Sequence, residues 1–200
     1  MNQTKDTTEP QNQAASASAA QPGTSRATPT LNVPPTLEAF MAQALAMENE
    51  AVDRYTDFAD AMETHNNPEV AAMFRTMAGY EAKHAQQIMQ EMGWTQAPAV
   101  ALGSMAWTGF DAPEAAPSDA VHYLMRPWHA LQLALAAEQR AEAFFGALAD
   151  AATSDVVRKA ALELQAEEAE HVVLVQAWLS KVPRPDNDWA SDPDPPRYTE

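Results

Sequence analysis

The sequence predicts an all-α protein: an antiparallel four-helix bundle built from a duplicated helical hairpin, with a long crossover connection between the halves. Glycine is rare, at 6 of 200 residues, and alanine is abundant, which favours helices over a turn-rich β protein. Four long segments place apolar residues at alternating spacings of three and four. Two of them align without a gap at an offset of 90 residues: ALAMENEAVDRYTDFADA from Ala44 and ALAAEQRAEAFFGALADA from Ala134.

The composition divides the chain into three parts. Residues 1–35 are rich in Gln, Ala, Ser, Thr and Pro, with only Leu31 and Val33 as sizeable hydrophobic residues, so we expect a disordered N-terminal tail. Residues 183–200 hold five prolines and five acidic residues, which predicts an extended, Pro/Asp-rich C-terminal tail. The bundle domain is therefore expected at residues 36–182.

The first helix is expected over residues 36–65, after Pro34-Pro35, and the second over residues 68–92, ending before Gly93. The third is expected to begin near Pro127, since proline is tolerated in a first helical turn, and the fourth spans residues 154–181. The connection from Gly93 to about Arg126 is too long for a tight turn and can run the length of a bundle. Within it, residues 118–125 are expected to form a short helix.

A glutamate stands in the middle of each apolar stripe. A buried, unpaired carboxylate costs several kcal/mol, so four of them facing one another need positive charge between them, and two divalent cations would supply it. In the second and fourth helices a histidine follows three residues later, on the same helix face. The chain has no cysteine, so ligands must be oxygen and imidazole. The predicted ligands are Glu48, Glu81, His84, Glu138, Glu168 and His171, a set typical of di-iron and di-manganese bundles.

These residues also carry a resemblance. Glu48 with Tyr55 seven positions on, Glu81-Ala-Lys-His84, Glu138 with Phe145 seven positions on, and Glu168-Ala-Glu-His171 resemble the rubrerythrin-like branch of the ferritin-like di-iron carboxylate superfamily. The resemblance implies a ferritin-like fold and a cofactor of two iron ions, with manganese as the alternative. It implies that Glu81 and Glu168 bridge the metals, that Glu48 and His84 complete one ion, and that Glu138 and His171 complete the other.

The resemblance also implies that the hydroxyl of Tyr55 hydrogen-bonds a ligand carboxylate, which makes Tyr55 the candidate catalytic residue. Full rubrerythrins differ from this chain, because they carry a cysteine-ligated rubredoxin module and often a further glutamate three residues after the third-helix ligand. Here that position is Ala141. Glu142, rotated by roughly 40° from Glu138 on a helical wheel, is a candidate seventh ligand.

The leading functional hypothesis is a di-iron oxidoreductase of ferroxidase or peroxidase type. It would oxidise Fe²⁺ or reduce O₂ or H₂O₂ in iron handling or oxidative-stress defence. Two alternatives stay open. The same six ligands could serve oxygenation of an organic substrate such as a fatty aldehyde, which needs a long apolar tunnel. The chain could also be a non-catalytic ferritin-like scaffold for metal binding or interaction.

The charge of the chain bears on its partners. With 12 basic and 28 acidic residues, the formal net charge is −16, so we expect no nucleic acid and no anionic membrane as partner. No signal-peptide pattern and no run of about 18 apolar residues is found, so a cytoplasmic location is expected. We also expect a homo-oligomer, a dimer.

Overall fold

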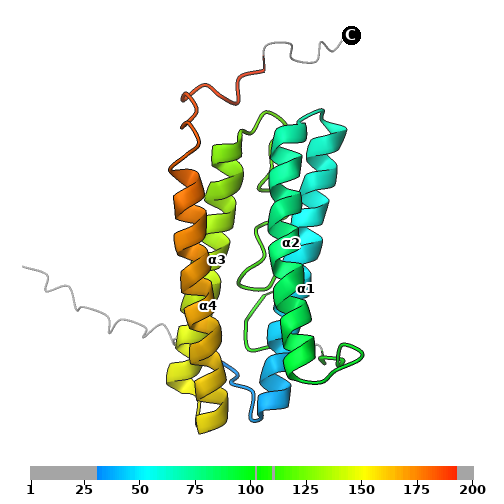
Figure 1. The fold of residues 1–200 in the computed structure, drawn as a ribbon, viewed down its shortest axis with the longest axis vertical. Coiled ribbons are helices and arrows are strands. Elements are labelled where there is room, and N and C mark those ends of the chain that lie inside the picture. The colour runs from blue at the N-terminus through cyan, green and yellow to red at the C-terminus, as the bar shows by residue number, and fades with distance from the viewer. Residues whose placement is uncertain (1–30, 102, 110, 193–200) are drawn as a thin grey trace, which may run out of the picture. The chain divides into compact units, whose positions relative to one another are not determined.

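The computed structural model describes residues 31–101, 103–109 and 111–192. This part of the chain forms four helices and no strand: α1 (Leu37–Thr64), α2 (Pro68–Glu91), α3 (Pro127–Ala151) and α4 (Asp155–Leu179). Figure 1 shows α1 beside α2 and α3 beside α4, each pair forming a hairpin. The predicted bundle of two helical hairpins is therefore confirmed. None of the described helices combines the length and the apolar character needed to cross a membrane.

Local chemistry explains where the helices begin and end. The Thr36 hydroxyl caps α1 by accepting a hydrogen bond from the Ala39 backbone N–H at 3.2 Å. Asn67 caps α2, which has Pro68 in its first turn, where a missing backbone donor is harmless. Gly93 ends α2 because it adopts a φ of 65°, a left-handed conformation that glycine accepts at no steric cost.

The core is divided into two apolar clusters. One is centred on aromatic and aliphatic residues of all four helices towards the start of α1, where the rings of Phe40 and Phe145 meet edge to face at 6.2 Å. The other lies towards the end of α1, where Phe58 packs against Phe74 with ring centroids 5.2 Å apart. The buried glutamates of the four helices lie between these two clusters. Apolar side chains therefore cover the polar centre at both ends.

The crossover connection follows the bundle from the end of α2 to the start of α3 (Figure 1). The buried amide of Gln43 holds its first part, donating to the Ser104 carbonyl at 2.8 Å and accepting from the Ala106 N–H at 2.7 Å. Asn67 holds its last part by donating to the carbonyls of Tyr123 and Met125. The prediction of a short helix over residues 118–125 is wrong, since this stretch forms two separate turns.

The two terminal segments are described only in part. The predictions for residues 1–30 and 193–200 lie outside the described residues. Leu31 and Val33 are partly buried against the core cluster at the start of α1. Residues 183–192 contain no helix, and the Trp189 ring lies 3.9 Å from the His129 ring at the start of α3.

Candidate metal centre

The six predicted ligands come together in two groups at the middle of the bundle. Glu48, Glu81 and His84 form one group, and Glu138, Glu168 and His171 form the other. In each group, one ligand atom from every residue lies within 4.8 Å of the others, which is close enough for the three to hold one metal ion. Each group combines one residue from the first helix of a hairpin with an E-x-x-H pair from the second helix.

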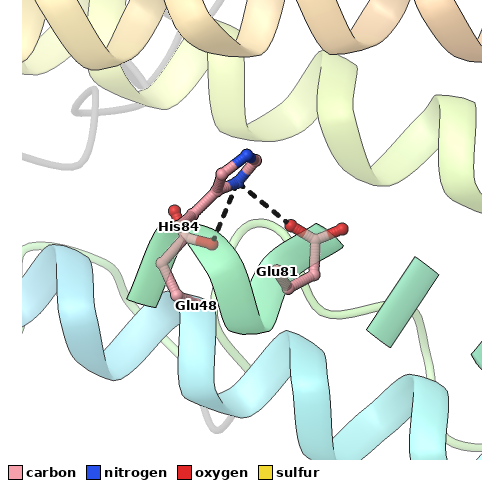
Figure 2. A group of neighbouring side chains, drawn as sticks. All are labelled: Glu48, Glu81 and His84. Atoms are coloured by element: carbon pink, nitrogen blue, oxygen red, sulfur yellow. Dashed lines mark ion pairs between the residues drawn. The ribbon is translucent and has the colours of Figure 1, made fainter. Parts of the chain in front are cut away.

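The two groups have nearly the same geometry. His84 Nδ1 lies 3.7 Å from Glu48 Oε2 and 3.6 Å from Glu81 Oε2. Dashed lines in Figure 2 mark these two ion pairs. In the second group, His171 Nδ1 lies 3.5 Å from Glu138 Oε2 and 3.2 Å from Glu168 Oε2. The internal repeat of the sequence has therefore become an approximate twofold repeat of the site.

The two groups also lie against each other. The imidazole rings of His84 and His171 stack in parallel, with centroids 4.3 Å apart and an interplanar angle of 2°. The four helix glutamates are 1–3 % exposed, whereas the histidines are only partly buried. Carboxylates therefore occupy the interior of the centre, and the imidazole pair lies nearer the surface.

Electrostatics favour protons in this centre when no metal is bound. Burial raises the pKa of Glu48 to about 7, with a further contribution from the negative charges of Glu81 and Glu138. Burial likewise raises the pKa of Glu168 to about 8, against the opposing effect of its contact with His171. Burial lowers the affinity of both histidines for protons, but their carboxylate neighbours outweigh it and raise the pKa of each to about 10. Metal binding would therefore displace protons.

The donor set fits a pair of hard cations. One oxygen of each of Glu48, Glu81 and Glu138 is buried without any hydrogen-bond partner. Buried polar groups are nearly always satisfied, so these unpartnered carboxylate oxygens, spread over two neighbouring groups, are what sites for two cations would present. Carboxylate oxygen with imidazole nitrogen suits iron or manganese.

Tyr55 lies next to this centre, one helical turn beyond Ala51 on the seam of α1. It is 1 % exposed, and its ring stacks on Phe74 at 6.1 Å. Its hydroxyl is buried without a hydrogen-bond partner, so the bond to a ligand carboxylate implied by the resemblance is not formed in this structure. Burial, together with the charges of Glu81, Glu138 and Glu114, raises the pKa of Tyr55 well above its ordinary value.

A fifth buried carboxylate was missed by the sequence analysis. Glu114, in the crossover connection, is 1 % exposed and forms a third possible metal-holding group with Glu48 and Glu168. Burial and the charges of four helix glutamates raise its pKa well above the usual range. The available signal was local: Glu114 is the only charge in the stretch Ala-Pro-Glu-Ala-Ala-Pro, whose small apolar residues are suited to burial.

Glu142, the other candidate for a seventh ligand, is only partly buried and belongs to none of the metal-holding groups among residues 31–101, 103–109 and 111–192. The sequence around Glu50 predicts a side chain that faces solvent. Instead, its carboxylate accepts a hydrogen bond from the Ala112 backbone N–H at 3.1 Å and so helps to hold the crossover connection.

A small cavity reaches the centre between α2 and α4. It has a volume of about 10 Å³ and is lined by Glu81, Glu138 and His171 together with apolar and aromatic residues that include Tyr80 and Trp178. This is about the room that a single water molecule needs.

Two helical hairpins with paired glutamate and histidine groups at the middle define a ferritin-like bundle. A family model described as Rubrerythrin matches residues 39–100. The crystal structure of an uncharacterized conserved protein from Magnetospirillum magnetotacticum MS-1 is similar, at 36 % sequence identity and a TM-score of 0.55, covering 76 % of this chain and 98 % of that chain. A comparison with curated proteins found no significant match. The chain belongs to the rubrerythrin-like branch of the ferritin-like superfamily.

Proposed function

We propose that this protein is a di-iron oxidoreductase that oxidises Fe²⁺ or reduces O₂ or H₂O₂, in iron handling or oxidative-stress defence. The observation that carries the proposal is the pair of neighbouring Glu-Glu-His groups, one from each hairpin, whose histidine rings stack on each other. Glu48 and His84 would complete one ion and Glu138 and His171 the other, with Glu81 and Glu168 serving both, as the resemblance implies. When bound, two iron ions supply the electrons for reducing O₂ or peroxide, and manganese is the alternative metal.

The protein's own residues would limit access and exclude bulk water. Ala51 and Ala141, both buried, follow Glu48 and Glu138 by one turn and leave room beside the ligands. Tyr55 and Phe145 come one turn later, each in the same core cluster as the alanine before it, and their rings would close the space beside that alanine. With a cavity of about 10 Å³ at Glu81 and Glu138, a small oxidant fits better than a long acyl chain. Tyr55 is the one further side chain proposed to take part in the reaction.

The test is to mix the anaerobic, Fe²⁺-loaded protein with O₂ or with H₂O₂ and to follow the ferric absorbance. A parallel sample receives a long-chain aldehyde and a reductant. Fast oxidation without aldehyde turnover supports the proposal. Sustained release of hydrocarbon and formate would favour an oxygenase instead, and a protein that binds no iron would favour a scaffold.

The cytoplasmic location and the homodimer are also inferences, and they rest on the sequence. Light scattering on the purified full chain measures the second directly.

A further inference from the structure

The crossover connection enters the bundle between α1 and α3. These two helices share no close backbone contact. Both instead bind the stretch from Asp111 to Ala116, in which Ala112, Ala115 and Ala116 are buried along with Glu114. Because the alanine side chains of this stretch are small, its backbone can lie between α1 and α3, where the two helices would otherwise pack directly against each other.

Helix side chains fix the backbone on both sides of Glu114. From α3, Arg140 donates to the carbonyl of Pro113 at 2.8 Å and to that of Ala115 at 3.2 Å. From α1, Arg54 donates to the carbonyl of Ala116 at 2.7 Å. These hydrogen bonds satisfy the carbonyls of a non-helical segment inside the protein and hold residue 114 in one orientation.

That orientation directs the Glu114 side chain into the centre. One of its oxygens lies within 4.8 Å of oxygens of Glu48, on α1, and Glu168, on α4. Both oxygens of Glu114 are buried without a hydrogen-bond partner. A carboxylate in this position would raise the energy of the folded state strongly unless a cation compensated it. Arg54 and Arg140 do not neutralise it, since their guanidinium groups donate to backbone carbonyls and to Asp111.

We propose that Glu114 is a seventh ligand of the metal pair, an oxygen donor that the crossover connection adds to the ions held by Glu48 and Glu168. The inference rests on the proposed dinuclear centre and extends it. Six ligands come from the helices, but the seventh comes from the connection, so metal binding also fixes that connection onto the bundle. Arg54 and Arg140 are positioning residues, because they act on the metal centre only through the backbone beside Glu114.

The test uses the full chain and Mn²⁺, a probe that is stable in air. Glu114→Gln keeps the size of the side chain but removes its charge, and Asp119→Asn, at an exposed position of the same connection, is the matched control. Mn²⁺ affinity is measured by titration, and amide hydrogen exchange over residues 103–117 is measured with and without Mn²⁺.

We expect Glu114→Gln to lower Mn²⁺ affinity by at least about 10- to 100-fold, because removing even a group that only supports a metal ligand costs that much. We expect Mn²⁺ to protect residues 112–116 from exchange in the wild type and in Asp119→Asn, but not in Glu114→Gln. The metal-free melting temperature of Glu114→Gln should rise, because one of five crowded carboxylates is gone. If Glu114 had only a structural role, its substitution would not raise the metal-free melting temperature while lowering Mn²⁺ affinity.

The proposal is overturned if Glu114→Gln binds Mn²⁺ with wild-type affinity and shows wild-type protection, since Glu114 would then act as a neutral carboxyl group that an amide can replace. In that result the wild type still binds two ions, so the proposed function stands. A wild type that binds no metal would overturn the proposed function itself. If Glu114→Gln does not fold, Glu114→Asp serves instead: its charge is kept but its oxygens are drawn back by one methylene. Loss of Mn²⁺-dependent protection then supports the proposal, and wild-type protection overturns it.

Discussion

Metal loading should stabilise this bundle strongly, because the same ions that bind the two groups relieve repulsion among five buried carboxylates: Glu48, Glu81, Glu114, Glu138 and Glu168. A ligand that binds only the folded state adds about 2.7 kcal/mol at a free concentration of 100 times Kd, so two ions add about 5 kcal/mol. For a domain of this size, 1 kcal/mol shifts Tm by about 2–4 °C, which gives a rise of about 10–20 °C.

The assay is a thermal melt of the chelator-treated protein with and without Mn²⁺, beside a measurement of bound metal per chain. Glu81→Gln and Glu168→Gln should lose most of the metal-induced rise, because the resemblance assigns each of them to both ions. Glu170→Gln is the matched control, since Glu170 is exposed on α4 only two residues from Glu168. Equal melting temperatures with and without metal, and no metal bound at micromolar concentration, would refute the reasoning.

Two further predictions concern the site histidines in the metal-free protein and the hydroxyl of Tyr55. Both site histidines have a pKa of about 10 when folded against 6.5 as the ordinary value, so the stability that their protonation contributes is complete below pH 6.5 and is lost as the pH rises towards 10. Urea unfolding in chelator should therefore give a smaller free energy of unfolding at pH 9 than at pH 6, and the reverse order would contradict these pKa shifts. Tyr55→Phe should leave the free energy of unfolding unchanged or raise it by about 1 kcal/mol, because the hydroxyl is buried without a partner. Its ferric absorbance after O₂ should develop more slowly at unchanged metal content, and a wild-type rate would remove Tyr55 from the reaction.

The sequence alone was sufficient to predict the four helices and to predict that the six glutamates and histidines on them come together. Helical periodicity is a local property, so the seams of α1 to α4 could be read from spacing, and the caps at Thr36 and Asn67 lie next to the residues they serve. Each E-x-x-H pair shares a helix face by geometry alone. The duplication then placed the two halves in matching register, so the convergence of both groups followed without knowledge of a tertiary contact.

Tertiary structure decided what the crossover connection does. Its residues have no period of their own, and their path depends on side chains more than 20 positions away, such as Arg140 on the carbonyl of Pro113. Asn67 similarly holds the carbonyls of Tyr123 and Met125, in the stretch where a short helix was expected. The burial of Glu114 follows from these long-range hydrogen bonds. From the sequence, a carboxylate in a loop is expected to be a solvent-exposed charge. Only the residues that surround it in the folded protein make it part of the centre.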